Sequence, residues 1–238
     1  AWEGNGDRPD RWRDTQVRVQ GPVLRQMQVA FARAWAEATG EFLSARHLFS
    51  AEPAGSLTCQ LMDSVPGSAT NPARLSFLVA TSAARRTIDV TVAYFVLDSL
   101  GREALREAAG RGVHVRLILA SRQTDIDAIR YAGRSYYHEL LQAGVEIYEF
   151  QPARLHAKTM IVDGAWASVG STNLDRRSFG FNYESNLNVF DDGFAAQMEA
   201  MFERDLALSN RVTLEEWRKR PFKEKFLETF YGLFRAQY

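Results

Sequence analysis

Apolar and polar positions follow two rhythms along the central part of the chain. Short apolar runs rich in valine, isoleucine and leucine predict buried strands, and longer stretches with apolar residues every three to four positions predict amphipathic helices. The expected strands cover 87–96, 113–119, 145–150, 155–162, 166–169 and 184–190, and the expected helices 72–86, 98–110, 125–143 and 193–208, with Asp98 as the expected N-cap of the second helix. This alternation favours an α/β fold, in which a largely parallel mixed β-sheet is flanked by helices on both faces.

The first part of the chain is more polar. Its opening residues are expected to form a loop, followed by a short strand at 15–19 and, further on, a strand at 57–62. Between these strands, apolar residues recur at helical spacing: Leu24, Met27, Phe31 and Trp35. This spacing predicts a helix within 21–40.

The C-terminal part carries an aromatic stripe. Thr213 and Glu216 form an expected capping box, which predicts that a helix begins there. Beyond Pro221, phenylalanine recurs every four positions, at Phe222, Phe226, Phe230 and Phe234. Three cations lie near this stripe in the sequence: Lys223, Lys225 and Arg235. Such a stripe either docks on the protein's own core or lies on an anionic bilayer surface.

Charge and composition narrow the possible functions. The chain has 29 basic and 29 acidic side chains, so its formal net charge is zero. This balance gives no global attraction to nucleic acid, and no nucleic-acid partner is expected. Clusters of Cys or Asp and Glu with metal-ligand spacing are absent from the sequence, and neither a metal nor a cofactor is expected. No apolar run approaches the roughly 20 residues of a transmembrane helix.

One constellation carries most of the functional information. His156, Lys158 and Asp163, followed by Gly170, Ser171 and Asn173, form the pattern HxKxxxxDxxxxxxGSxN. A neutral imidazole can attack phosphorus, while an ammonium and an amide hold the phosphoryl oxygens. Lys158 is also the one lysine in the first 218 residues of an arginine-rich chain. The pattern therefore predicts phosphoryl-group transfer through a covalent phosphohistidine.

A β-hairpin is expected to bring these residues together. His156 and Lys158 are two positions apart in a strand and so project to the same face. Asp163-Gly164 predicts the turn, and a two-residue turn would place Ser171 opposite His156. A three-residue loop would shift this register by one position. Either register brings a nucleophile, a cation and neutral hydrogen-bonding groups into one small volume.

The block RLHAKTMIVDGAWASVGSTNLDRRSFGFNYESNLNVFD resembles the second HxKxxxxD motif of the phospholipase D superfamily, and more narrowly that of bacterial cardiolipin synthases. The likeness extends over about 55–210. It implies that His156 is the nucleophile and that Lys158 and Asn173 bind phosphate oxygens. Ser171 would add a hydroxyl to the same pocket. Asp163 occupies the family's aspartate position and is grouped with the catalytic residues, although it is expected to shape the hairpin and its hydrogen bonds more than to touch substrate.

Two further residues enter through the same resemblance. Glu184 matches a carboxylate that accepts a hydrogen bond from the second imidazole nitrogen, which would fix the ring's tautomer. Tyr94 lies near the pocket and is expected to reach the phosphate or line the cleft. For each, a purely structural role is the alternative: a solvated carboxylate for Glu184 and a core aromatic for Tyr94.

The chain departs from the family by carrying one motif. The other histidines are His47, His114 and His138, and none has a lysine two residues later. A second histidine is expected to protonate the leaving alcohol, and it would come from an upstream half or from a second subunit. The expected regions are a C-terminal remnant of a first half-domain over 1–50, a catalytic half-domain over 51–210 and an amphipathic helical segment over 211–238.

The leading expectation is a phosphatidyltransferase of the cardiolipin synthase type, acting on a phosphatidylglycerol-like phospholipid at the bacterial cytoplasmic membrane. The alternatives are a hydrolytic phospholipase D and a single-motif homodimeric phosphodiesterase or nuclease. A catalytically silent lipid-binding or dimerisation module is the alternative from a different class.

Overall fold

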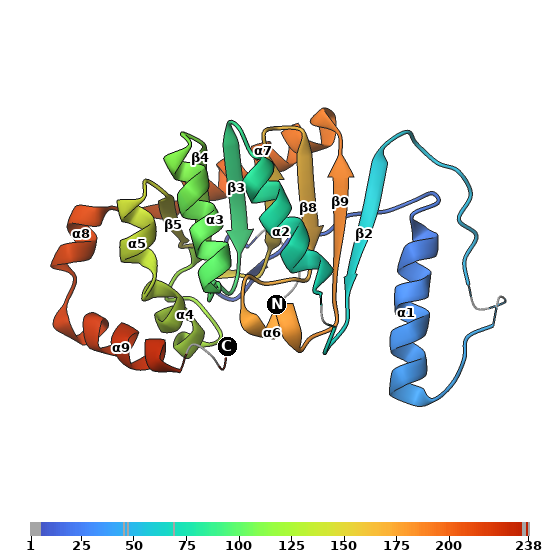
Figure 1. Ribbon diagram of the computed structural model, residues 1–238, viewed down its shortest axis with the longest axis horizontal. Helices are drawn as coiled ribbons and strands as arrows, with labels where there is room; N and C mark the ends of the chain where they lie inside the picture. Colours follow the sequence, from blue (N-terminus) through green and yellow to red (C-terminus); the bar gives the residue numbers. More distant parts are fainter. Residues whose placement is uncertain (1–5, 45, 47, 69, 235–236, 238) are drawn as a thin grey trace.

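The computed structural model describes residues 6–44, 46, 48–68, 70–234 and 237 (Figure 1). Within them, one large sheet contains the strands β2 (Thr58–Ser64), β3 (Thr87–Val92), β4 (His114–Ala120), β5 (Glu146–Phe150), β7 (Lys158–Val162), β8 (Trp166–Gly170), β9 (Glu184–Phe190) and β10 (Ser209–Val212). Their order across the sheet is β10-β5-β4-β3-β7-β8-β9-β2. A separate two-stranded sheet joins β1 (Trp12–Arg13) to β6 (Arg154–Leu155).

The described helices are α1 (Leu24–Thr39), α2 (Pro72–Ala83), α3 (Ser99–Gly110), α4 (Asp127–Arg134), α5 (Tyr137–Gln142), α6 (Arg176–Gly180), α7 (Asp192–Ala207), α8 (Leu214–Lys219) and α9 (Phe222–Leu233). None of them is both long and apolar enough to cross a membrane. Asp98 caps α3 through a hydrogen bond from Gly101 N to its Oδ1 atom, as the sequence predicts.

The expected α/β class with a mixed sheet is confirmed, but the expectation that the sheet is largely parallel is wrong. Only the β3–β4 and β4–β5 pairs are parallel, and the other neighbours in the large sheet run antiparallel. Helices α3 to α5 make the crossovers that parallel neighbours require. β7 instead turns back to β8 through a three-residue loop, which can join only antiparallel strands, and β9 returns antiparallel to β8 after a longer connection that contains α6.

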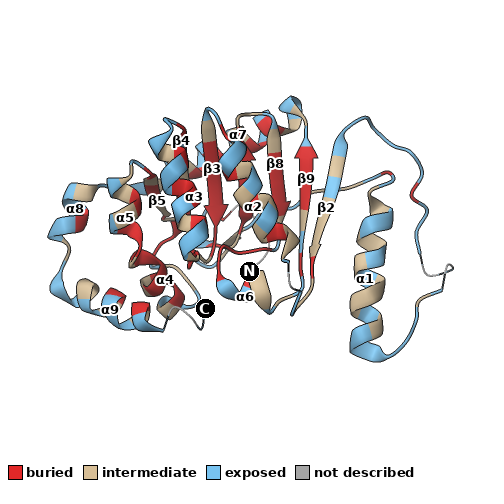
Figure 2. Ribbon diagram, viewed as in Figure 1, coloured by how far each residue is buried: buried red, intermediate tan, exposed pale blue. Residues whose placement is uncertain are grey.

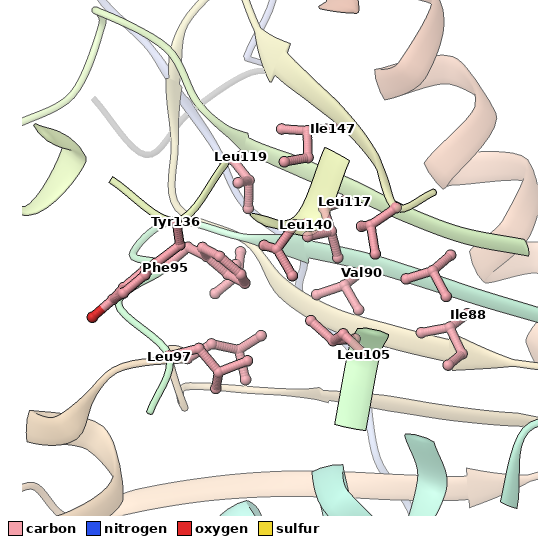
Figure 3. Close-up of a cluster of buried hydrophobic side chains, with 14 of the residues drawn as sticks. Ile88, Val90, Phe95, Leu97, Leu105, Leu117, Leu119, Tyr136, Leu140 and Ile147 are labelled. Atoms are coloured by element: carbon pink, nitrogen blue, oxygen red, sulfur yellow. The ribbon is translucent and has the colours of Figure 1, made fainter. Parts of the chain in front are cut away.

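Helices cover both faces of the sheet and create two apolar layers (Figure 2). On one face, side chains from α2, α3 and α5 pack against alternate strand residues, and Phe77 of α2 belongs to this cluster. Figure 3 shows other members of the cluster: Ile88, Val90, Leu105, Leu117, Leu140 and Ile147. On the other face, α7 contributes Ala195, Met198 and Phe202 and meets Ile118, Phe150 and Ile161. The strands near the motif are therefore buried on both sides, which holds the motif on a rigid support.

Three expected elements differ in the structure. The predicted strand at 15–19 is not formed, and the strand lies earlier, in β1. The predicted helix over 125–143 is broken into α4 and α5. The predicted strand over 155–162 is interrupted at His156 and Ala157, whose backbone N–H groups both donate to the carbonyl oxygen of Arg13. The N-terminal segment thus takes the place that a neighbouring strand would have beside the motif.

Helix α1 agrees with its prediction and ends at Gly40, which has a φ of 74°. This left-handed conformation suits glycine and closes the helix. None of its residues is buried, although the sequence gives it an apolar stripe; Val29 is 67% exposed and Phe31 is 60% exposed. In Figure 1, α1 lies beside the edge strand β2, away from the rest of the sheet.

Candidate active site

The β7–β8 hairpin closes with a three-residue loop, because Val162 pairs with Trp166. Asp163 and Gly164 both have left-handed backbones, with φ of 54° and 63°. The alternative of a two-residue turn is therefore wrong, and Ser171 does not lie opposite His156. The hairpin itself is confirmed.

His156 is held by a carboxylate from the N-terminal segment. Its Nδ1 atom lies 2.9 Å from Oδ2 of Asp14, and its side chain is 31% exposed. The ring of Trp12 meets the imidazole edge-on at a centroid distance of 5.1 Å. A carboxylate at Nδ1 keeps the proton on that nitrogen and leaves the lone pair on Nε2. The contact therefore fixes the tautomer that the expected nucleophile would need.

Asp14 owes its position to its neighbour Arg13. The Arg13 carbonyl oxygen accepts hydrogen bonds from His156 N and Ala157 N at 2.8 and 3.1 Å. Its guanidinium forms a two-armed ion pair with Asp205 of α7, with N–O distances of 2.8 and 2.7 Å. Two parallel N–H···O bonds fix geometry better than a single contact does. The segment that carries Asp14 is thus tied to the catalytic strand and to a core helix.

Lys158 lies in the floor of the site and is only 6% exposed. Burial lowers its pKa to about 8, against the opposing effect of the nearby carboxylates of Asp14 and Glu184. Its ammonium donates to the backbone carbonyl oxygen of His156. The structure therefore ties the Lys158 side chain to the backbone of His156.

Asn173 and Tyr94 come from two loops that run side by side. The Leu174 N–H donates to the Tyr94 carbonyl oxygen, and the Val96 N–H donates to the Leu174 carbonyl oxygen. The Tyr94 N–H donates to Oδ1 of Asn173 at 3.2 Å, so the amide NH₂ group of Asn173 is left to donate elsewhere. This loop pair continues from the end of β3, directly beside Lys158, which pairs with Val92.

The Tyr94 side chain has a different partner from the one expected. Its hydroxyl donates to Oδ2 of Asp125 at 2.6 Å. Burial, followed by the Asp125 contact, raises the pKa of Tyr94 above its usual value. Its hydroxyl therefore stays protonated and is committed to a carboxylate.

The expected role of Glu184 as the partner of His156 is wrong, because Asp14 holds that position. Glu184 is 6% exposed and accepts hydrogen bonds from Ser171, from Ser178 at 2.7 Å and from Asn182 at 3.2 Å. The expectation for Ser171 changes with it, since the Ser171 hydroxyl donates its hydrogen bond to Glu184. Glu184 and Ser171 together hold the loop that presents Asn173.

Asp163 lies at the far end of the hairpin. Its carboxylate accepts from the backbone N–H groups of Arg85, Arg86 and Thr87 at 2.9, 2.7 and 2.9 Å. Burial alone would raise its pKa, but these donors outweigh burial and the pKa lies below its usual value. Seven residues of strand span about 23 Å between Asp163 and His156. The grouping of Asp163 with the catalytic residues is therefore wrong, and its role in shaping the hairpin is supported.

Sequence reasoning missed Asp14 and Asp175. Asp175 caps α6 by accepting from Ser178 N at 2.7 Å, and burial raises its pKa to about 6. Its local signal is an aspartate three residues before a serine at a helix start. Asp14 has no such signal, because its contact with His156 spans 142 positions.

Two of the other histidines, His114 and His138, take no part in this arrangement. His114 is exposed and its Nε2 atom lies 3.5 Å from Glu146, and His138 is exposed on α5. His47 lies outside the described residues. In the part of the chain that the structure describes, no group of three or more His, Cys, Asp or Glu side chains is placed to hold a metal ion.

The fold and the motif together define a phospholipase D-like domain. Residues 78–206 match the family described as "Cardiolipin synthase, PLD-like domain", so the chain belongs to that family. Cardiolipin synthase A of Proteus mirabilis is 35% identical over 226 residues, which are 92% of this chain and 46% of that protein. Cardiolipin synthase A of Pseudomonas aeruginosa is 39% identical over 207 residues, 87% of this chain and 42% of that protein. The chain thus spans about half the length of these curated relatives.

Solved structures show the same fold. Phosphatidylserine synthase of Haemophilus influenzae superposes with a TM-score of 0.61 at 14% identity, over 89% of this chain and 52% of that one. The phospholipase D family member Nuc of Salmonella typhimurium gives a TM-score of 0.56 at 21% identity, over 66% of this chain and 99% of that one. At these identities the likeness concerns the fold alone.

Proposed function

We propose that the chain supplies one half of a phosphatidyltransferase active site of the cardiolipin synthase type. The main support is the contact between Nδ1 of His156 and Asp14, which leaves the lone pair on Nε2 of a ring that is partly exposed. Lys158 begins β7 two residues after His156, and Asn173 follows β8; both carry donors suited to phosphoryl oxygens. The substrate would be a phosphatidylglycerol-like phospholipid of the bacterial cytoplasmic membrane. This part of the enzyme would associate with that membrane peripherally.

In the first step, Nε2 of His156 attacks the phosphorus of the lipid phosphodiester. A P–N bond forms, the P–O bond to the leaving alcohol breaks, and that oxygen takes a proton from a second histidine. Asp14 stabilises the positive charge that develops on the ring. The Lys158 ammonium neutralises the negative charge on the non-bridging oxygens, and the Asn173 amide donates hydrogen bonds to them.

In the second step, the hydroxyl of an acceptor alcohol attacks the same phosphorus, and the P–N bond breaks. The second histidine removes the proton from this hydroxyl, which restores the starting state. We assign that histidine to the first HxKxxxxD motif, from an upstream half or a second subunit. In this proposal 1–50 belongs to the first half-domain, 51–210 is the second, catalytic half-domain and 211–238 is an appended helical segment.

Trapping the covalent adduct tests this function. The chain is incubated with phosphatidylglycerol labelled at the phosphate, alone and with the upstream half of a curated relative such as that of Proteus mirabilis, and then quenched in alkali. We expect acid-labile label on His156, increased by the second half. His156→Gln should abolish it, and His138→Gln, on an exposed helix position, should not. Absence of label in both arrangements would refute the function.

A further inference from the structure

Helix α9 and its C-cap residue carry five large apolar side chains that are exposed. Their exposed fractions are 81% for Phe222, 57% for Phe226, 44% for Phe230, 75% for Leu233 and 41% for Phe234. We call these five residues the phenylalanine face. An amphipathic helix on a globular protein normally turns such a stripe toward the core. The alternative that this stripe docks on the protein's own core is therefore wrong.

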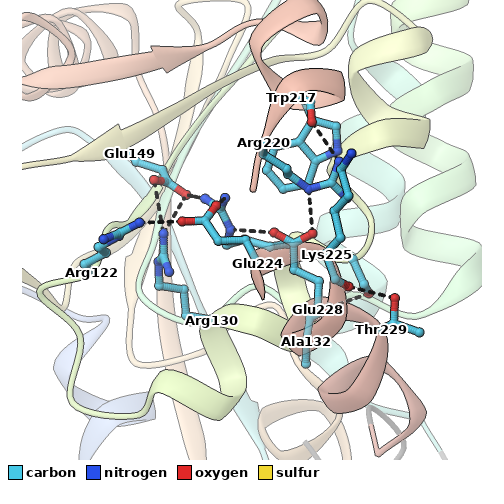
Figure 4. Close-up of polar contacts among 12 residues, drawn as sticks. Arg122, Arg130, Ala132, Glu149, Trp217, Arg220, Glu224, Lys225, Glu228 and Thr229 are labelled. Carbon is cyan, nitrogen blue, oxygen red and sulfur yellow. Dashed lines mark hydrogen bonds and ion pairs between the residues drawn. The ribbon is translucent and has the colours of Figure 1, made fainter. Parts of the chain in front are cut away.

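The opposite side of α9 is bound to the protein by charged groups (Figure 4). Glu228 is 2% exposed and accepts from Nε of Arg134 at 3.1 Å and from Nε of Arg220 at 2.8 Å. Glu224 pairs with Arg134 at 3.0 Å and also contacts Arg122. Buried ion pairs of this kind become strongly unfavourable when one partner is removed, so they define which side of the helix faces inward.

Aromatic and close backbone contacts hold the same orientation. The rings of Tyr131 and Tyr231 stack at 5.8 Å with planes 11° apart, which joins α4 to α9. Gly232 is buried against Ser135, where an added Cβ would lie 3.4 Å from the serine Cβ. A rotation that buried the phenylalanine face would break these contacts. The exposure of the face is therefore built into the fold.

Charge is sorted between the two sides of α9. Both of its carboxylates, Glu224 and Glu228, point inward to arginines. Lys223 is exposed among the phenylalanines, whereas Lys219, exposed just before the helix, pairs with Glu215. Three of the four lysines in the chain fall within 219–225. Arg235, the third cation of the sequence pattern, lies outside the described residues. The outer surface is thus aromatic and cationic within a chain of zero net charge.

This combination fits the interfacial layer of an anionic bilayer. Phenylalanine rings enter the boundary between head groups and acyl chains, while ammonium groups remain level with the phosphates. We propose that the phenylalanine face docks the chain on a membrane that contains anionic phospholipids. The docking needs no catalysis, although its purpose rests on the proposed function, whose substrate lies in such a membrane.

Vesicle flotation with the whole 238-residue chain tests the docking. The test variant is Phe222→Ser/Phe226→Ser/Phe230→Ser. The matched control changes three exposed phenylalanines elsewhere, Phe42, Phe49 and Phe181, to Ser; these are 90%, 82% and 63% exposed. Circular dichroism and thermal unfolding establish that both variants are folded.

We expect the wild type to float with vesicles of phosphatidylglycerol and phosphatidylcholine, and to float less with phosphatidylcholine alone or at high salt. The affinity of the test variant for the vesicles should be lower by about tenfold or more, and the control variant should bind as the wild type does. Lys223→Gln/Lys225→Gln should reduce binding to the anionic vesicles alone.

Three results would overturn the docking: no flotation of the wild type, equal losses in test and control variants, or a concentration-dependent dimer that the test variant abolishes. The dimer would identify a second copy as the occupant. His156→Gln separates the two proposals, because it should float normally while forming no phosphohistidine. A chain that floats but never forms the adduct would retain the docking and refute the proposed activity.

Discussion

The Nδ1 atom of His156 lies 2.9 Å from Oδ2 of Asp14, a residue 142 positions earlier in the chain. This contact makes the N-terminal segment part of the candidate site. Asp14 is the residue after β1, and β1 pairs with β6 immediately before His156. The orientation of the histidine therefore depends on a strand pair outside the main sheet.

Removing the charge of Asp14 should slow the first chemical step. We expect Asp14→Asn to lower the rate of phosphohistidine formation by roughly 10² to 10⁴, because the amide neither selects the tautomer as well nor stabilises the imidazolium. Rapid-quench labelling in the complemented protein measures this rate. Asp10→Asn, an exposed change whose native partner is Arg8, is the matched control and should keep the wild-type rate. Equal rates for wild type and Asp14→Asn would show that the contact has no catalytic role.

Anion binding should follow the protonation of Lys158. Because burial lowers the pKa of Lys158 to about 8, the ammonium is present below that pH and is lost as the pH rises through it. Sulfate is a suitable probe, since its own charge is constant in this range. Calorimetric titration should show its affinity falling above about pH 8, and Lys158→Met should bind weakly at every pH. A wild-type affinity that stays flat from pH 7 to pH 10 would contradict this assignment.

Lys158 should lower the free energy of unfolding at neutral pH. A pKa of about 8 in the folded chain lies below the ordinary value of 10.5, so the unfolded chain binds the proton more tightly. The contribution of Lys158 to the free energy of unfolding therefore rises as the pH increases from about 8 to 10.5, and it is lowest below pH 8. We expect Lys158→Met to raise the melting temperature at pH 7 by about 2–5 °C, with a smaller gain at pH 10. The exposed change Lys223→Met should leave it unchanged, and a lower melting temperature for Lys158→Met would refute the argument.

Asp163 should act on stability. We expect Asp163→Ala to lower the free energy of unfolding by about 1–3 kcal/mol, because three backbone N–H groups lose their acceptor and alanine resists a φ of 54°. Asparagine tolerates that conformation and retains an acceptor, so Asp163→Asn should lose less. Urea unfolding measures both variants. Unimpaired sulfate binding by the folded variants would separate this role from catalysis.

The lowered pKa of Asp163 adds a pH signature to its role. A carboxyl whose pKa is lower in the folded chain contributes stability above its unfolded pKa of about 3.9 and loses it as the pH falls through the folded value. The difference in unfolding free energy between wild type and Asp163→Ala should therefore shrink below about pH 4. A difference that stays constant down to pH 2 would point to the backbone conformation alone.

Local patterns predicted many of the elements but not how they meet. Asp98 as a helix cap, Gly40 as a helix end and the hairpin at Asp163 all depend on atoms within a few residues of one another. The break between α4 and α5 and the interruption of the catalytic strand at His156 follow instead from contacts with distant segments. A periodic pattern of apolar residues carries no information about such contacts.

By itself, the sequence determined the chemistry: an imidazole, an ammonium and an amide at the spacing of His156, Lys158 and Asn173, on strands whose burial is visible as apolar runs. Only the tertiary structure decided that Asp14 contacts His156, that Glu184 accepts hydrogen bonds from the loop after β8, and that α9 exposes its phenylalanines. The reason is physical. Backbone periodicity, caps and turns are set by neighbours along the chain, whereas a carboxylate's partner depends on which segments the sheet brings within hydrogen-bonding distance.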